Sequence, residues 1–192
     1  MTHLDPEGWS RAIHSRDISE LLPTVRQMAV WLLSECTARR IDAVVVSTFR
    51  DPEAQAYLYN HQLSKWPPGW SFHEHRAAFD IMILRHGRPI GTTEAADVEL
   101  WNQVGKLAVD LVGLEWAGAW DEQHREFPHF QHTWGRTIKD MQNGETLPET
   151  ISGPRSFTGR GMSRWWRMKL SLAHWMMRRG ESLYYSMTRP AR

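Results

Sequence analysis

Two histidines and an aspartate in this chain could together bind one divalent metal ion. His73 and Asp80 lie close together in the sequence, and His129 follows much later. Imidazole nitrogens and carboxylate oxygens are zinc ligands, and three protein ligands leave a fourth position for water, as in catalytic zinc sites. Glu126, three residues before His129, supplies a further carboxylate. These residue types predict a zinc hydrolase.

The spacing of His73 and Asp80 requires a bend in the chain. They are seven positions apart, an odd separation that would place their side chains on opposite faces of one continuous strand. The apolar run 79–84 predicts a buried strand with Asp80 near its start, and His73 on the loop that enters it, after the turn-rich segment 67–70. An aspartate in such a run is costly to bury unless it is paired or coordinated. A local cap or ion pair would explain Asp80 alone, but together with His73 and His129 it fits a metal ligand.

Other histidines compete for the metal, because the chain has ten of them. His75 and His132 lie near His73 and His129, and either could be a ligand in a different scheme. We interpret both as residues that support the site or line its cleft. A zinc deaminase site would need a later pair of cysteines, whereas the chain has one. The absence of a His-Glu-x-x-His motif from the sequence excludes the common zincin arrangement.

Several carboxylates before His129 could act as the general base that receives a proton from water. The candidates are Glu115, Asp121, Glu122 and Glu126. Glu126 is tied to His129 by a short spacer that Pro128 stiffens. We expect the other three to lie on an exposed loop or to hold the Trp-rich segment. Chain geometry therefore favours Glu126.

The elements that must position these residues predict an α+β fold, with a small, mainly antiparallel sheet and helices packed on one side. Helices are expected from Asp17 to about Arg40, after Asp51-Pro52, and over 94–112 before Gly113; strands are expected over 43–48, 79–84 and 127–133. Arg50 then lies at a strand-to-helix junction. From the end of a buried strand we expect it to point into the site and stabilise an oxyanion.

The first metal-binding segment resembles a known family. Ser71-x-His73-x-x-x-x-Ala78-x-Asp80 is similar to the Ser-x-His-x-x-Gly-x-Ala-x-Asp signature of zinc peptidases that cut bacterial cell-wall peptides. That family includes VanY-like D-alanyl-D-alanine carboxypeptidases and phage L-alanyl-D-glutamate endopeptidases. It shares its fold with the hedgehog signalling domain, so the resemblance implies a hedgehog/DD-peptidase-like fold. One departure is Arg76, which stands where the family usually has Gly and could alter the loop that presents His73.

Further segments resemble the same family in the same order, so that the resemblance covers roughly residues 15 to 137. The run 115–120 is similar to the family's Trp-Gly-Gly-x-Trp element, and 126–130 to its Asp/Glu-x-Pro-His-Phe element. The run 47–55 is similar to its Gly-Tyr-Arg segment with a later Gln. Glu126 stands where many phage members have Asp, which is a mild chemical change.

The resemblance implies hydrolysis of an amide bond in the peptide stem of peptidoglycan, with Zn²⁺ on His73, Asp80 and His129 lowering the pKa of its bound water. It implies that Glu126 is the base and that Arg50 polarises the scissile carbonyl. Gln55 and Ser71 would form hydrogen bonds within the site or to substrate. The form of 47–51 favours an L-alanyl-D-glutamate-type, endolysin-like endopeptidase. The alternatives are a D-alanyl-D-alanine carboxypeptidase and a non-catalytic, zinc-containing wall-binding module.

The composition indicates a soluble globular protein with one sizeable domain and a modest extension. The chain has 192 residues, of which 41% are hydrophobic and 23% charged. Tryptophans beside Pro, Gly or His predict an aromatic-lined cleft, although core packing is the default for any single one: Trp66, Trp70, Trp116, Trp120 and Trp134. The lone Cys36 excludes an intramolecular disulfide, and we expect it to be structural in a helix.

The charge distribution divides the chain. Residues 141–192 carry nine Lys/Arg and three Asp/Glu, a net charge of +6. Residues 1–140 carry fourteen Lys/Arg and nineteen Asp/Glu, a net charge of −5. We expect a zinc peptidase domain over 1–140, a linker over 141–162 and a basic amphipathic tail over 163–192. The Trp-bearing tail could contact an anionic membrane or lipopolysaccharide, or equally dock onto the domain. The near-neutral total charge argues against a nucleic-acid partner.

The first residues predict where the protein is made. The run 1–7 is polar and acidic, without the features of a signal peptide, so we expect cytoplasmic synthesis. The inferred substrate lies outside the inner membrane. Release by a partner holin would bring the protein to the periplasm and cell wall, in phage lysis or in wall remodelling.

Overall fold

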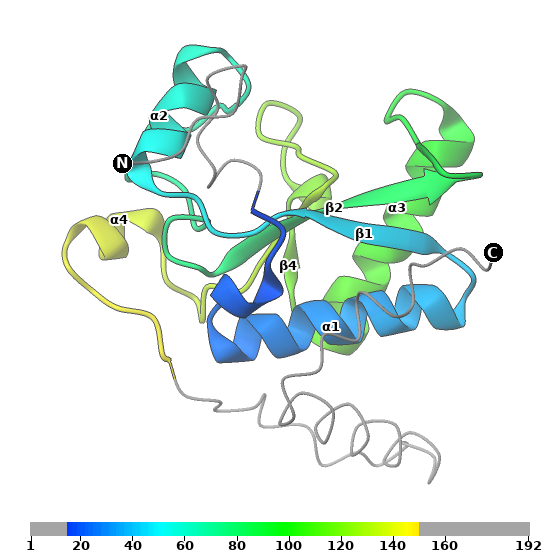
Figure 1. Ribbon diagram of the computed structural model, residues 1–192, viewed down its shortest axis with the longest axis horizontal. Coiled ribbons are helices and arrows are strands. Elements are labelled where there is room, and N and C mark those ends of the chain that lie inside the picture. The colour runs from blue at the N-terminus through cyan, green and yellow to red at the C-terminus, as the bar shows by residue number, and fades with distance from the viewer. Residues whose placement is uncertain (1–14, 150–192) are drawn as a thin grey trace, which may run out of the picture. The chain divides into compact units, whose positions relative to one another are not determined.

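The computed structural model describes residues 15–149, which form an α+β domain around one antiparallel sheet, as predicted (Figure 1). The strands are β1 (Asp42–Ser47), β2 (Ala78–Arg85), β3 (Arg88–Pro89), β4 (Glu115–Trp116) and β5 (His129–Gln131). They lie in the order β1-β2-β5-β4, and β3 pairs with β2. The helices are α1 (Pro23–Ala38), α2 (Pro52–Asn60), α3 (Ala95–Leu107) and α4 (Ile138–Gln142), with short helical turns at Ile18–Glu20, Ala108–Val112 and Ala117–Ala119.

The main core lies between one face of the sheet and the helices α1 and α3. From Phe79 to Leu84, buried and part-buried side chains alternate along β2, as a strand with one buried face requires. The buried residues include Val25, Leu32, Val45, Phe79, Ile81, Ile83, Trp101, Val104 and Phe130. In Figure 1, α1 lies below β1 and β2. None of the helices within residues 15–149 is long and apolar enough to cross a membrane.

The first helix begins later than the sequence predicts. Asp17 accepts a hydrogen bond from the backbone N–H of Ser19, but it caps only the short turn Ile18–Glu20. Leu22 is extended, with φ −52° and ψ 143°, and α1 starts at Pro23. A proline disfavours helical conformation in the residue before it and lacks an N–H for a helical hydrogen bond, so the chain breaks there. The predicted cap at Asp51 is confirmed, because its side chain accepts from the N–H of Ala54 at 2.7 Å.

A β-bulge in β1 changes which residue faces the second side of the sheet. Val45 lies opposite Ile81 on the core side, but the register then shifts so that Ser47 lies opposite Asp80. Bulges commonly re-aim a side chain beside a functional site. Here the bulge places the Ser47 hydroxyl beside Asp80 and away from the core.

The pairing of β2, β5 and β4 places polar residues in adjacent cross-strand pairs. Asp80 pairs with His129 across β2 and β5, and Gln131 pairs with Glu115 across β5 and β4. His129 and Gln131 are two residues apart in one strand, so they share a face. Phe130, between them, points to the core. This polar face carries the candidate site.

The packed domain extends past the predicted boundary at residue 140. Met141 and Leu147 are buried with Phe72 and Ala77 in a second apolar cluster. A segment that contributes to a core is not a free linker, so the start of the expected linker belongs to the domain. The rest of the linker and the basic tail lie outside the described residues.

Candidate metal centre

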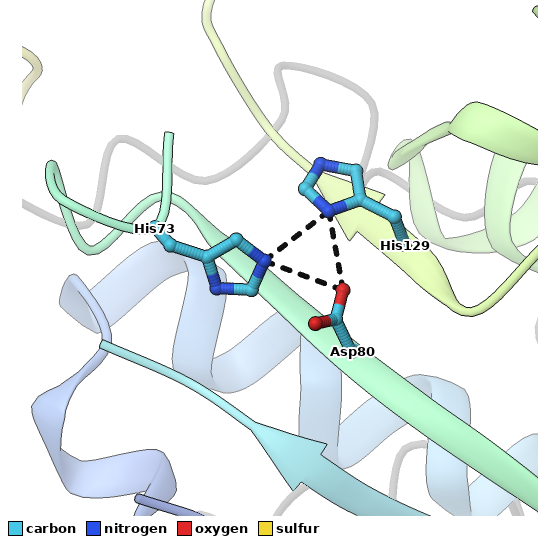
Figure 2. Close-up of side chains that lie close together, drawn as sticks. All are labelled: His73, Asp80 and His129. Carbon is cyan, nitrogen blue, oxygen red and sulfur yellow. Dashed lines mark hydrogen bonds and ion pairs between the residues drawn. The ribbon is translucent and has the colours of Figure 1, made fainter. Parts of the chain in front are cut away.

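Three side-chain atoms converge at one point on the polar face of the sheet (Figure 2). His73 Nε2 lies 3.3 Å from Asp80 Oδ1 and 3.2 Å from His129 Nδ1, and His129 Nδ1 lies 3.2 Å from Asp80 Oδ1. The two imidazoles and the carboxylate thus point toward one another from a loop, β2 and β5. The three ligands predicted from the sequence are brought together by the fold.

His73 is presented by a tight turn that resolves the odd spacing. Its backbone N–H donates to Ser71 Oγ at 3.3 Å, and its carbonyl accepts from the N–H of Arg76 at 3.1 Å. Arg76 adopts φ 59°, in the left-handed region that favours glycine. Its guanidinium lies 4.8 Å from the ring centroid of Phe49, a cation–π contact that helps to hold an arginine there. The loop therefore keeps a glycine-like backbone despite the substitution.

The His73 ring is held in one tautomer by the backbone. Its Nδ1 lies 2.5 Å from the carbonyl oxygen of Thr48, which can only accept, so Nδ1 carries the proton and Nε2 has a lone pair. The residue is 1% exposed. Burial, together with the Arg50 cation, lowers the pKa of His73 to about 4, so the ring is neutral at pH 7.

Asp80 divides its two oxygens between different partners. Oδ1 faces the histidines, while Oδ2 lies 2.5 Å from Nη2 of Arg50. Arg50 Nε also donates to Ser47 Oγ at 3.2 Å, which fixes the guanidinium beside the bulge. Burial would raise the pKa of Asp80, but the neighbouring His73 and Arg50 hold it well below its usual value. Asp80 is therefore ionised.

His129 has a polar partner on each ring nitrogen. Nδ1 faces Asp80, and Nε2 lies 3.0 Å from Gln131 Oε1. Gln131 in turn donates from Nε2 to Glu115 Oε2 at 2.9 Å. Burial opposes protonation of His129, but the hydrogen bond to Asp80 raises its pKa above the usual value.

The structure separates the carboxylates that compete for the role of base. Glu115 accepts hydrogen bonds from Gln131 and Thr133 and is occupied within the sheet. Asp121 and Glu122 are exposed, and Asp121 Oδ1 lies 2.8 Å from Nδ1 of His124. Glu126 is half-buried, and its carbonyl accepts from the His129 N–H at 3.2 Å, so it lies in the turn that leads into the ligand. Its charge is close enough to favour the protonated form of His129.

Two predicted substrate-binding residues have contacts within the fold. Gln55 is fully buried at 0% exposure, and its amide donates to Ser64 Oγ at 3.0 Å and to the carbonyl oxygen of Trp66 at 2.6 Å. It has no surface with which to touch a substrate, so we correct its expected role to holding the loop that carries Trp66. Ser71 supports His73 and also lines the cleft beside the site.

A cleft of about 440 Å³ includes His129 in its wall. Indole rings from three loop positions line it: Trp66, Trp70 and Trp120. Trp66 stacks on His124 with ring centroids 5.5 Å apart, and Lys65 Nζ donates to the Gln123 carbonyl at 2.7 Å, so the two flanking loops are joined. A larger hollow of about 730 Å³ is lined by none of these residues. The aromatic cleft thus borders the candidate metal centre through His129.

Other residues singled out in the sequence lie elsewhere. His75 packs edge-on against Phe72, and His132 against Trp134 at a centroid distance of 4.5 Å, so neither lines the cleft. Trp116 is a core residue, as expected of most single tryptophans. Gln131, Thr48 and Ser47 were not predicted as site residues. Only Gln131 has a local signal, because it shares a strand face with His129.

Comparison with known proteins finds similar solved structures. No protein-family model and no curated protein matches the chain. Among solved structures, the L-Ala D-Glu endopeptidase ChiX of Serratia marcescens has 19% identity and a TM-score of 0.49, covering 64% of this chain and 88% of its own. The L,D-carboxypeptidase DacB of Streptococcus pneumoniae has 21% identity and a TM-score of 0.44, and the match covers 66% of this chain and 74% of DacB. VanYB in complex with D-alanine-D-alanine has 13% identity and a TM-score of 0.43, and the match covers 76% of this chain and 90% of VanYB.

By their names, ChiX is an L-Ala D-Glu endopeptidase and DacB an L,D-carboxypeptidase. At such low identity, structural similarity concerns the fold alone, and one fold can host many functions. The side chains of the metal centre must therefore support any assignment of function.

Proposed function

We propose that the protein is a zinc-dependent peptidase that hydrolyses an amide bond in the peptide stem of peptidoglycan. The observation that carries this proposal is the convergence of His73 Nε2, Asp80 Oδ1 and His129 Nδ1, beside a Trp-lined cleft that His129 also lines. Two nitrogens and one oxygen are a donor set for catalytic zinc. The fit is supported by Thr48 and Gln131, which hold the far nitrogen of each ring as metal-binding histidines usually require.

When bound, zinc would supply Lewis acidity that polarises an amide carbonyl and lowers the pKa of a water molecule. In this proposal Glu126 accepts the proton of the attacking water and passes it to the amine nitrogen as the C–N bond breaks. Arg50 keeps Asp80 ionised and in place, and its positive charge stabilises the negative charge that develops on the carbonyl oxygen. The Trp-lined walls of the cleft would bind the peptide and exclude water.

Within the stem peptide, we propose the L-alanyl-D-glutamate bond, because the form of residues 47–51 resembles that of endopeptidases. The test is to digest purified peptidoglycan with the zinc-loaded protein and to identify the new amino termini by mass spectrometry. New D-glutamate amino termini support the proposal. Release of free D-alanine would instead identify a carboxypeptidase. Bound zinc with no cleavage of any stem bond would identify a non-catalytic module.

A further inference from the structure

A row of hydrogen bonds, buried at His129 and part-buried at Glu115, runs from His129 through Gln131 and Glu115 to Thr133. We propose that Gln131 and Glu115 are positioning residues that fix the tautomer of His129, so that its Nδ1 lone pair faces the metal. This inference rests on the proposed zinc site and assigns the two residues a role in metal binding. Gln131 is 6% exposed, Thr133 is 3% exposed and Glu115 is part-buried, so the row is partly shielded from water.

The direction of each hydrogen bond follows from Thr133 and Glu115. The backbone N–H of Thr133 donates to Glu115 Oε1 at 3.0 Å, and its hydroxyl donates to the same oxygen at 2.5 Å. An ionised carboxylate can only accept, so Gln131 must turn its NH₂ group toward Glu115 Oε2. Gln131 Oε1 then faces His129 Nε2 at 3.0 Å, and Nε2 must carry the proton. The other nitrogen, Nδ1, is left to bind metal.

The backbone holds the row in register. Glu115 and Gln131 are direct cross-strand partners in β4 and β5, which brings their side chains together on one face. Trp116 fixes β4, because its Nε1 donates to the Phe127 carbonyl at 2.9 Å. A Cβ at Gly105 would lie 2.1 Å from the Trp116 ring, so this packing is close. Glu115 therefore has little freedom to move away from Gln131.

The two histidine ligands differ in what sets their tautomers. His73 donates to the backbone carbonyl of Thr48, which no side-chain substitution removes. His129 depends on the side-chain amide of Gln131, which Glu115 orients. Metal affinity is therefore sensitive to the chemical identity of position 115, although Glu115 does not touch the three converging ligand atoms.

The test is the isosteric substitution Glu115→Gln compared with the double substitution Glu115→Gln/Gln131→Glu. In the single variant, the new amide offers its oxygen to Thr133 and its NH₂ to Gln131. Gln131 must then turn over and present NH₂ to His129 Nε2, which favours the proton on Nδ1. We expect the zinc Kd to rise about 10- to 100-fold, as for other groups that orient metal ligands. In the double variant, a carboxylate at position 131 accepts from both neighbours, and most of the lost affinity should return.

Nitrogen-15 NMR of the His129 ring in the metal-free protein supplies a second readout, at a pH where the ring is neutral. Asp80 Oδ1 attracts a proton to Nδ1 in every variant. We therefore expect a larger share of the Nε2–H tautomer in the wild type and the double variant than in Glu115→Gln. A single variant with wild-type zinc Kd and tautomer, or a double variant no better than the single one, would overturn the inference. Neither the zinc Kd nor the NMR measurement requires a peptide substrate. A wild type that shows the Nε2–H tautomer but binds no zinc would refute the proposed function and support the tautomer assignment.

Discussion

Arg50 and Asp80 form an ion pair that leaves only one carboxylate oxygen facing the histidines. Nη2 of Arg50 lies 2.5 Å from Asp80 Oδ2, and both side chains are 14% exposed. The pair spans β2 and the junction after β1, and Ser47 holds the guanidinium from the bulge. Arg50 thus contacts a candidate metal ligand directly, in addition to any contact with substrate.

Replacing Arg50 should therefore impair metal binding as well as hydrolysis. We expect Arg50→Ala to raise the zinc Kd about 10- to 100-fold, because Asp80 loses the partner that orients it. Competition with a zinc chelator measures this Kd. Arg85→Ala is the matched control, since it removes an ion pair with Asp97 at the other end of β2. If the Arg50→Ala protein binds zinc with wild-type affinity but has lost hydrolysis, Arg50 acts on the substrate and not on metal binding.

The three proposed ligands predict one zinc ion per chain. His129→Ala should lose most of the bound metal, as measured by elemental analysis, and chelation of the wild type should abolish hydrolysis until zinc is restored. His132→Ala serves as the control, because His132 packs against Trp134. Stoichiometric zinc in the His129→Ala protein would show that the ligand set is wrong.

Glu126 is predicted to act on protons and not on the metal. Glu126→Gln should keep zinc and thermal stability, while kcat falls by about 10² to 10⁴, the usual range for loss of a general base. The exposed Glu122 offers a control, and we expect Glu122→Gln to retain kcat. Full activity in the Glu126→Gln protein would transfer the role of base to another group.

Gln55 is predicted to stabilise the loop that carries Trp66. Gln55→Leu leaves the part-buried Trp66 carbonyl and Ser64 hydroxyl without their amide donor, at a cost of about 1–3 kcal/mol in the free energy of unfolding. Denaturant titration of the metal-free protein measures this loss. A variant of unchanged stability with a raised KM would restore the role in substrate binding that the sequence suggested.

Cys36 is predicted to be unreactive in the folded protein. It is fully buried in α1, and this burial raises the pKa of its thiol to about 12. The thiolate is the reactive form, and it is scarce at pH 8 when the pKa lies far above that value. A thiol reagent should label the protein only after denaturation. Rapid stoichiometric labelling of the native protein would mean that α1 packs differently.

Local chemistry explains why parts of the fold could be predicted from the sequence. The apolar run 79–84 has the length of a strand, and Asp51-Pro52 specifies a helix start, so β2 and α2 follow from neighbouring residues. The start of α1 is predicted too early. Asp17 caps only a short helical turn, and Pro23 disfavours a helical backbone at Leu22, so α1 begins at Pro23.

Residue types alone specify which side chains could bind a metal, because the donor atoms of His73, Asp80 and His129 do not depend on the fold. The groups that hold those donors in place follow from the folded structure instead. The partner of Arg50 depends on a bulge that sets Ser47 against Asp80, and the link from His129 to Glu115 depends on strand register. Register joins residues far apart in the chain through hydrogen bonds between strands, and no short segment contains that information.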